Sequence, residues 1–474
     1  MTRYEQLAAQ IRQQIEDNIW QVGDRLPSLR ESVKQSGLSL MTVVQAYQLL
    51  ESQGWIAARP QSGYYVARRN TNFAAAKGGK GLHLNENVEI NASIFGVLQA
   101  CKDPDIIPFG SAFPEPALLD EPKLGKSLAS VARRLARFNT TANLPPGNEQ
   151  LRRNIAQRYA SQGIHVAPDE IVITAGAMES LVLSLQSVTQ PGDWVVIESP
   201  AFYGSLQAIE RLKLKAIAIK TDPLFGIDLD ALEDIAAKYP IKACWLMTHY
   251  QNPLGGTMPP ANKKRLVEIL NKNQIALIED DVYGELYFGS QQPIPAKALD
   301  VKGNFFHCSS FSKCLAPGYR VGWVAAGRHA TKIQHLQMMS TVSASVPTQL
   351  AIAEYLTQGG YDSHLRKLRQ TMEQRQHQML GAIAQYMPSS VKVNTPKGGY
   401  FLWLEFEPPF NAIRLYQLAL KEGISIAPGS MFSTSDQFNH AFRLNTSFTW
   451  NAQLDQAMKT LGRLCHSLII DKRG

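Results

Sequence analysis

Apolar residues recur at helical spacing in three segments near the start of the chain. Residues 4–19 carry an apolar side chain at every third or fourth position, which predicts a helix with one buried face. Ser28 and Glu31 have capping-box spacing and begin a second helix that Gly37 ends. Ser39 caps a third helix, in which the positions predicted to face inward are Leu40, Val43, Tyr47 and Leu50. Two short helices joined by a tight turn predict a helix-turn-helix.

A hairpin is predicted directly after these helices. Residues 55–59 and 64–68 have the composition of short strands, and the segment 60–63 between them contains Pro and Gly, which favour a turn. A hairpin in this place forms the wing of a winged helix-turn-helix.

The periodicity changes beyond residue 105, where short apolar strands alternate with helical segments. The predicted strands are residues 170–174, 194–198, 243–247, 275–279 and 305–309. Continuous apolar strands that alternate with helices predict an α/β fold with a mostly parallel sheet, covered by helices on both faces. In such a sheet, ligands bind at the carboxyl ends of the strands.

A segment of low complexity separates the two patterns. Residues 70–81 are rich in Ala, Gly and Lys and contain few apolar groups, so this segment lacks the surface needed for a core of its own. We therefore predict an N-terminal domain at 1–69, a linker at 70–104 and a large domain at 105–474.

Composition and charge narrow the classes of function. The 474-residue chain has a net charge of +8, and its first 80 residues hold ten Lys or Arg against six Asp or Glu, which favours a polyanionic partner for the N-terminal domain. No apolar run reaches the roughly 18 residues of a membrane-spanning helix. The five cysteines are scattered without C-x-x-C spacing, which argues against a disulfide framework or a metal site. No export signal is visible, so we expect a cytoplasmic protein.

The third helix has the features that DNA reading requires. Ser39, Thr42 and Gln45 place hydrogen-bonding groups on its outer face. Cationic side chains that suit phosphate contacts lie nearby in the sequence, at Arg25, Arg30, Arg59 and Arg68. Composition alone supports equally well a packing module with a solvated basic face.

The motifs in this region favour the DNA-binding interpretation. Leu26-Pro-Ser-Leu-Arg30, the Ser39–Gly54 segment with Thr42, Val43, Ala46 and Glu51 at fixed spacing, and Arg59-x-x-Ser-Gly63 together resemble the winged helix-turn-helix of GntR-type regulators. The resemblance covers about 65 residues. It implies that double-stranded promoter DNA is contacted by Ser28, Arg30, Ser39, Thr42, Arg59, Ser62 and Gly63.

Polar or reactive residues follow each of the predicted strands of the large domain. Small residues at 174–180 open a helix whose free N–H groups suit a phosphate. Phe202, Asn252 and Asp280 follow the next three strands. Lys313 comes after the last one, in apolar surroundings that lower the pKa of an amine and make it nucleophilic toward an aldehyde.

This order of motifs resembles the fold-type I, pyridoxal-phosphate-dependent aminotransferases of class I and II. The resemblance rests on Asn252-Pro-x-Gly255, Asp280-x-x-Tyr283 and Ser310-x-Ser-Lys313-x-x-x-Pro-Gly-x-Arg320. It implies that Lys313 forms an aldimine with pyridoxal 5′-phosphate, that Asp280 pairs with the pyridine nitrogen, and that Asn252 and Tyr283 hold the phenolic oxygen.

The same resemblance assigns the remaining contacts. Phe202 stacks on the ring, in a position where Tyr or Trp is common, and Arg443 binds the carboxylate of an amino-acid-like ligand. The implied phosphate shell comprises Gly176, Ala177, Ser310, Ser312 and Arg320. Residues 143–147 depart from the family pattern because they lack its usual aromatic residue.

The combination of the two domains resembles the MocR-type transcriptional regulators. The resemblance implies a DNA-binding protein that senses a B6 vitamer or an amino-acid-like effector through Lys313, and a head-to-tail homodimer with exchanged domains. Two alternatives stay open. One is a working aminotransferase tethered to DNA, with Lys313, Asp280 and Tyr283 as catalytic residues, and the other is a degenerate dimerisation platform.

Overall fold

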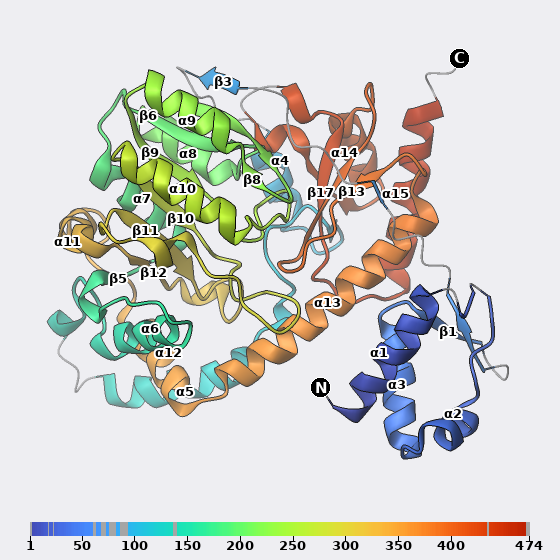
Figure 1. The fold of residues 1–474 in the computed structure, drawn as a ribbon. Coiled ribbons are helices and arrows are strands. Elements are labelled where there is room, and N and C mark those ends of the chain that lie inside the picture. The colour runs from blue at the N-terminus through green and yellow to red at the C-terminus, as the bar shows by residue number, and fades with distance from the viewer. Residues whose placement is uncertain are drawn as a thin grey trace. The chain divides into compact units, whose positions relative to one another are not determined.

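The computed structural model describes residues 2–17, 19–21, 23–59, 63–67, 73–74, 82–85, 93–135, 140–433 and 436–470 (Figure 1). The chain forms two compact units. One comprises Met1–Phe73, Thr371–Val391 and Thr446–Gly474, and the other comprises Ala74–Gln370 and Lys392–Asn445.

The N-terminal part of the first unit is a winged helix-turn-helix, as predicted. Its elements are α1 (Arg3–Glu16), α2 (Leu29–Ser36), α3 (Leu40–Ser52), β1 (Ile56–Arg59) and β2 (Gly63–Val66). Ser28 and Glu31 form the predicted capping box of α2, and Gly37 ends this helix in the left-handed conformation, with φ of 66°. Tyr47 lies at the centre of the core, where its hydroxyl bonds Ser32 and the carbonyl of Pro27.

The prediction that Leu40 faces inward is wrong. Val43, Tyr47 and Leu50 are buried as predicted, but the side chain of Leu40 is 54% exposed. The cause is its position at the first residue of α3. The three-helix core begins one turn later, at Val43, so helical periodicity continues the apolar stripe beyond the end of the core.

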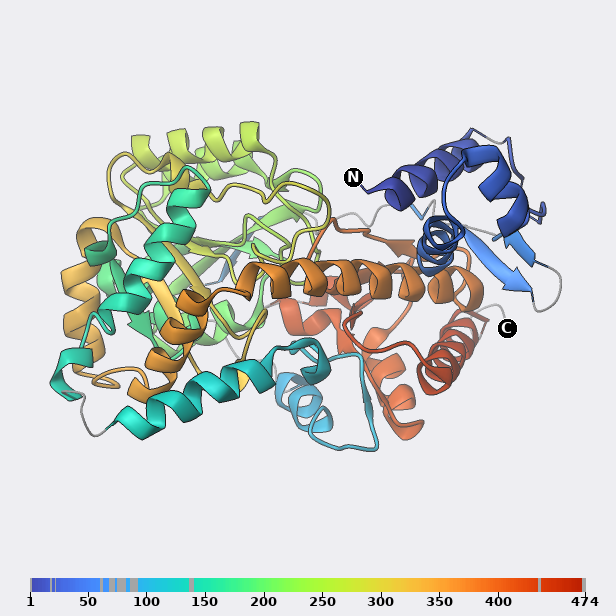
Figure 2. The same cartoon turned by 90° about the horizontal axis from the view of Figure 1, so that it is seen from below.

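Two long C-terminal helices contribute to the first unit. α13 (Tyr361–Tyr386) is a single helix of 26 residues, drawn in orange in Figure 2, and residues from 371 onward belong to this unit. α15 (Ala452–Ile470) packs closely on its end, because any Cβ at Gly462 would collide with the backbone of Tyr386. The hydroxyl of Tyr386 donates to Asp455.

The second unit is built on a nine-stranded sheet that is mostly parallel, which confirms the predicted α/β class. The path is β3-β7-β6-β9-β10-β11-β12-β5, and β8 pairs with β7. β12 runs antiparallel to both of its neighbours, and β3 runs antiparallel to β7. The strands are β3 (Leu82–Asn85), β5 (Ile171–Thr174), β6 (Trp194–Ser199), β7 (Lys215–Asp222), β8 (Gly226–Ile227), β9 (Ile241–Leu246), β10 (Ala276–Asp280), β11 (Phe305–Ser310) and β12 (Gly322–Ala325).

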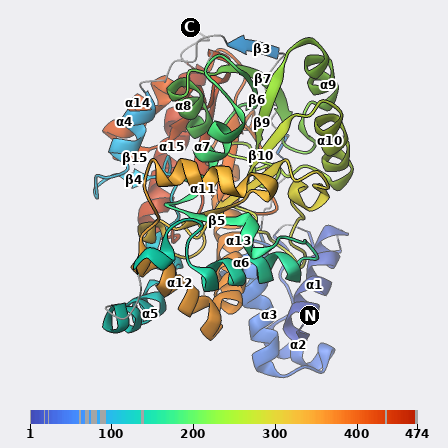
Figure 3. The same ribbon diagram turned by 90° about the vertical axis from the view of Figure 1, so that its left-hand side faces the viewer.

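Alternate residues of the central strands enter two apolar cores, one on each face of the sheet. Val195 and Ile197 belong to the core beneath α7 (Ala177–Val188), α8 (Tyr203–Arg211) and α11 (Ala330–Met338). Val196 belongs to the opposite core beneath α9 (Leu229–Lys238) and α10 (Pro260–Lys272). Figure 3 shows the two groups of helices on opposite sides of the sheet. Burial on both faces explains why these strands are continuously apolar.

The same unit contains two smaller sheets. An antiparallel sheet has the order β13-β14-β17-β16, and β15 pairs with β4. These strands are β4 (Ile107–Pro108), β13 (Lys392–Val393), β14 (Phe401–Glu405), β15 (Ile424–Ser425), β16 (Ala427–Pro428) and β17 (Ala441–Asn445). The other helices of the unit are α4 (Ser93–Ala100), α5 (Glu121–Arg134), α6 (Glu149–Ser161), α12 (Val346–Gln358) and α14 (Ala412–Lys421).

The stretch 70–104 contains more structure than the linker that we expected there. β3 pairs with β7, and α4 buries Ile94 and Val97 in a core of the second unit. The apolar residues of α4 follow the low-complexity segment too closely to be separated from it by composition. The exact domain boundaries stay a prediction.

None of the helices that the structure describes is long and apolar enough to cross a bilayer. Within the described residues, no group of three or more His, Cys, Asp or Glu side chains is placed to hold a metal ion.

Candidate functional site

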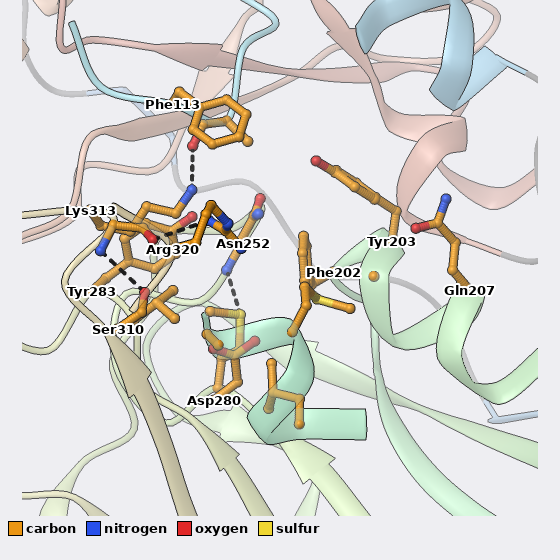
Figure 4. A pocket seen from close by; sticks show the side chains of 18 residues that line it. Phe113, Phe202, Tyr203, Gln207, Asn252, Asp280, Tyr283, Ser310, Lys313 and Arg320 are labelled. Atoms are coloured by element: carbon orange, nitrogen blue, oxygen red, sulfur yellow. Dashed lines mark hydrogen bonds between the residues drawn. The ribbon is translucent and has the colours of Figure 1, made fainter. Parts of the chain in front are cut away.

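A cavity of about 200 Å³ lies at the carboxyl ends of the central strands (Figure 4). The sequence analysis predicted that side chains following successive strands would meet here, and the structure brings most of them together. The predicted residues that line the cavity are Ala177, Phe202, Asn252, Asp280, Tyr283, Ser310, Ser312, Lys313 and Arg320. Two other predicted residues lie directly behind this lining, Gly176 beside Arg320 and Arg443 beside Asn252.

Lys313 presents its amine to the cavity from the turn that follows β11. Nζ donates a 2.8 Å hydrogen bond to the carbonyl of Ala112 and lies 4.5 Å from the ring centre of Phe113. Burial, together with the nearby charges of Arg443 and Arg320, lowers the pKa of this amine to about 7. A substantial fraction is therefore uncharged at neutral pH, which is the nucleophilic form.

Asp280 and Asn252 each aim an unsatisfied polar atom at the same cavity. Within the part of the chain that the structure describes, Asp280 Oδ1 and Asn252 Nδ2 are buried without a hydrogen-bond partner. Burial and the adjacent Asp281 raise the pKa of Asp280 to about 7. An unpartnered buried polar atom is costly, so a pair of them in one cavity indicates a ligand that supplies both an acceptor and a cationic donor.

The turn before α7 has the geometry of an anion site. Gly176 adopts φ of 103° and precedes the first residue of this twelve-residue helix, whose free N–H groups and dipole favour negative charge. The guanidinium of Arg320 donates to the carbonyl of Ala175 and to Ser312 Oγ, each at 3.3 Å. Residues with a side chain rarely adopt a φ of 103°, which explains the glycine at position 176.

Arg443 is held rigidly on β17, one layer behind the cavity. Its guanidinium donates to Asn252 Oδ1 at 2.8 Å and to the carbonyl of Gly110 at 2.7 Å. It lies 4.1 Å from the ring centre of Phe401 and 5.3 Å from that of Phe432. The side chain is fully buried, and its Nε has no partner among the described residues. Its second terminal nitrogen also donates to the carbonyl of Ser111, so Nε is the nitrogen left available for a ligand carboxylate.

Two aromatic side chains complete the cavity. Tyr283 is buried and packs edge-on against Tyr400 and Phe401, with ring centres 5.5 Å apart in both pairs. Burial raises the pKa of the Tyr283 phenol well above its usual value, so the phenol keeps its proton. Phe202 lies at the start of α8 and contacts Tyr203.

A buried network behind Asp280 was missed by the sequence analysis. Asp281 Oδ1 accepts a 2.9 Å hydrogen bond from His249 Nδ1, and Oδ2 accepts one of the same length from His307 Nε2. His249 is in turn 2.5 Å from the amine of Lys263, and His307 is 2.6 Å from the hydroxyl of Tyr159. These partners hold the pKa of Asp281 well below its usual range.

This network fixes the direction of Asp280. Neighbouring residues at a strand end point to opposite faces, so anchoring Asp281 to two histidines on one face turns Asp280 into the cavity on the other. The Asp-Asp doublet after an apolar strand was the available signal. The two histidines are 58 residues apart in the sequence and become neighbours only through the pairing of β9, β10 and β11.

The predicted DNA-binding residues differ in how far the structure describes and exposes them. Arg25, Arg30, Ser39 and Gln45 are exposed on the helix-turn-helix, whereas Ser28 and Thr42 are half-buried. Gly63 begins the wing beside the guanidinium of Arg25, which would lie 3.3 Å from a Cβ at this position. Ser62 and the side chain of Arg59 lie outside the described residues.

We predict that Lys313 is a lysine that titrates near neutral pH from within an open cavity. Labelling of cofactor-free protein with an amine-specific reagent, followed by peptide mapping, is expected to give a midpoint near pH 7 at Lys313. Because the carboxylate of Asp280 raises this pKa, Asp280→Asn is expected to move the midpoint lower. A midpoint near 10, the ordinary value for lysine, would contradict the described environment.

We predict that Asp281→Asn lowers the free energy of unfolding by roughly 3–5 kcal/mol, because it removes the carboxylate charge to which two buried histidines are hydrogen-bonded. Urea unfolding of the full chain measures this, with the exposed Asp234→Asn as a control that is expected to change it by less than about 0.5 kcal/mol. Since the pKa of Asp281 is depressed, its contribution is present above the unfolded value of about 4 and is lost as the pH falls below it. Equal stability of the two variants at pH 7 would show that the network carries no such role.

Comparison with known proteins finds a matching family for each of the two parts of the chain. The model of "Aminotransferase class I and II" matches residues 118–461, and that of "Bacterial regulatory proteins, gntR family" matches residues 3–66. Among solved structures, LysN, an alpha-aminoadipate aminotransferase of Thermus thermophilus complexed with N-(5′-phosphopyridoxyl)-L-leucine, matches with a TM-score of 0.73 and 26% identity, covering 80% of this chain and 96% of that one.

Relatives with the same two-part organisation span the whole length. The chain is 55% identical over 464 residues to the uncharacterized HTH-type transcriptional regulator YdcR of Escherichia coli K12, and the match covers 98% of this chain and 99% of that protein. It is 25% identical over 437 residues to the HTH-type transcriptional regulator NorG of Staphylococcus aureus, with 92% and 98% covered. The chain therefore belongs to the aminotransferase class I and II family, in the MocR-type group whose members join that domain to a GntR-type helix-turn-helix.

Proposed function

We propose that this protein is a transcriptional regulator that binds promoter DNA through its helix-turn-helix and responds to pyridoxal 5′-phosphate and an amino-acid-like effector bound in the cavity at Lys313. The observation that carries this proposal is the set of unpartnered atoms in that cavity, namely Asp280 Oδ1 and Asn252 Nδ2. They lie beside an amine with a pKa of about 7. The full-length similarity to HTH-type regulators supports the DNA-binding half.

The residues of the cavity fit pyridoxal phosphate in chemistry and in order. Lys313 would hold the aldehyde carbon, Asp280 the protonated ring nitrogen, and Asn252 Nδ2 the phenolic oxygen together with Tyr283. Phe202 offers a face for the ring. The phosphate would be held by the N-terminus of α7 at Gly176 and Ala177, and by Ser310, Ser312 and Arg320.

When bound, pyridoxal phosphate supplies a carbonyl group that exchanges amines and a ring that withdraws electrons. The chain's own residues prepare both functions. The lowered pKa of Lys313 leaves a substantial fraction of this amine uncharged and nucleophilic, and the carboxylate of Asp280, aimed by Asp281, would stabilise a protonated ring nitrogen. Arg443, whose guanidinium is held in place by Asn252 and Gly110, would bind the carboxylate of an incoming amine through its unpartnered Nε.

We predict that borohydride reduction of the full chain after incubation with pyridoxal phosphate leaves a phosphopyridoxyl group on Lys313, because this amine combines a low pKa with a place in the cavity. Peptide mapping by mass spectrometry identifies the modified lysine. Lys313→Ala is expected to lose the label, while Lys264→Ala, which removes an exposed lysine of α10, is expected to keep it. Labelling spread over surface lysines, unaffected by Lys313→Ala, would overturn the cofactor proposal.

The effector is proposed to carry an α-carboxylate. Arg443 is a buried cation behind the cavity, and its guanidinium contacts the rings of Phe401 and Phe432. The cavity is otherwise lined largely by apolar and uncharged side chains such as Phe113, Met178, Tyr203 and Gln207.

We predict that Arg443→Lys weakens amino-acid binding by about 10- to 100-fold, because a lysine lacks the guanidinium Nε that would contact the carboxylate. A panel of the twenty amino acids is titrated against cofactor-loaded protein while the absorbance of the bound cofactor is followed. Arg414→Lys, at an exposed position on α14, is expected to respond as the wild type does. An unaltered response of Arg443→Lys would show that the carboxylate is bound elsewhere.

We further propose that the protein acts as a homodimer, with one DNA module for each half-site. Exposed apolar side chains on the second unit support self-association. Met339 is 86% exposed and Val342 50%, in the turn after α11. Sedimentation equilibrium of the full chain measures the association directly.

A second candidate function is amino-group transfer. It is favoured by Arg443, Lys313 and Asp280, which together form a complete set for binding and proton transfer, and by 27% identity over 375 residues to an aromatic-amino-acid aminotransferase of Thermococcus litoralis. Steady-state conversion of an amino acid and a keto acid at about 10 per second would favour this function, whereas a spectral change without turnover favours the regulator.

A further inference from the structure

The first turn of α3 exposes two large apolar side chains. Leu40 is 54% exposed and Met41 is 68% exposed, side by side at the start of the helix that reads DNA in helix-turn-helix proteins. The core of this module is already filled by Val43, Tyr47 and Leu50. The exposed pair therefore contributes nothing to the module's own packing.

The hydroxyl groups predicted to read bases are already engaged within the helix. Ser39 Oγ lies 2.8 Å from Thr42 Oγ1 and accepts a hydrogen bond from the backbone N–H of Thr42 at 3.2 Å. These contacts cap α3. The side chains that project freely from its first turn are thus the apolar ones.

The rest of the exposed face of α3 is uncharged. Gln45 and Gln48 follow Met41 at helical spacing and are exposed. The sequence of α3, LMTVVQAYQLLES, contains neither Lys nor Arg. Guanine is most often read in the major groove by Lys or Arg, whereas glutamine pairs with adenine and apolar groups contact the methyl of thymine.

Cations lie on the neighbouring helix and turn rather than on α3. Arg30 and Lys34 are exposed on α2, and Arg25 is exposed beside the start of the wing. Positive charge that flanks an apolar and amide-bearing helix face matches a duplex, because phosphates lie on both sides of the groove. The charge distribution therefore favours DNA as the occupant of this face.

We infer that α3 recognises A·T pairs, with Leu40 and Met41 in contact with the 5-methyl groups of thymine and Gln45 directed at adenine. This inference rests on the proposed DNA-binding function and specifies its sequence preference. It assigns base recognition to Leu40 and Met41, which are apolar residue types that usually lie in a protein core.

The test uses a duplex selected from a random pool by the full chain. Each thymine of the selected half-site is replaced in turn by deoxyuridine, which removes only the methyl group, and affinity is measured by fluorescence anisotropy. At one or two positions the wild type is expected to lose roughly 3- to 5-fold in affinity, the effect of one buried methyl group. The same substitution is expected to have no effect on the Leu40→Ala, Met41→Ala double variant.

Ile19→Ala is the matched control, because Ile19 is 64% exposed on the same module but lies outside α3. This variant is expected to keep the full deoxyuridine effect. Since Leu40 and Met41 are exposed, their replacement is expected to leave thermal unfolding of the protein unchanged.

The possible outcomes distinguish DNA binding by the protein from base recognition by α3. If no duplex is selected, the proposed DNA-binding function fails. If a duplex is bound with equal affinity whether thymine or deoxyuridine is present, or if the half-site contains only G·C pairs, DNA binding stands and the inference about α3 is overturned. Retention of the methyl effect in the double variant would also overturn it.

Discussion

The cavity depends on how two adjacent carboxylates are accommodated at the end of one buried strand. Strand geometry directs Asp280 and Asp281 to opposite faces, and two carboxylates so close together cannot both be buried without compensation. Asp281 obtains its compensation from His249 and His307 within the protein. Among the described residues Asp280 Oδ1 has no hydrogen-bond partner, and burial together with the adjacent Asp281 raises the pKa of Asp280 to about 7. The fold thus leaves one unsatisfied carboxylate in a cavity that also holds a nucleophilic amine.

The two parts of the chain differ in the kind of side chain that a binding partner would satisfy. The large unit buries polar groups, such as Arg443, that a ligand can satisfy. The DNA module instead exposes apolar ones, Leu40 and Met41, that only a partner can cover. For a ligand in the cavity to alter DNA binding, its affinity must differ between two conformations that also differ in their affinity for DNA. Under the proposed function, exchange of amines at Lys313 would provide a chemical basis for such a difference.

Much of the fold and of the cavity could be predicted from the sequence because the signals are local. Caps at Ser28 and Gly37, apolar strands, and the residues that follow them lie within a few positions of one another. The buried partners of Asp281 could not be predicted, because strand pairing brings His249 and His307 together. Leu40 was mispredicted since periodicity cannot show where a core ends, and α4 was missed because a low-complexity segment precedes it.

We propose that occupancy of the cavity at Lys313 changes the affinity of this protein for DNA. The most direct test is the dissociation constant of the full chain for its selected duplex, measured without ligand, with pyridoxal phosphate, and with pyridoxal phosphate plus an amino acid that perturbs the cofactor spectrum. We expect the dissociation constant to change by about 5-fold or more in the wild type and not at all in Lys313→Ala. The same dissociation constant under all three conditions in the wild type would contradict it.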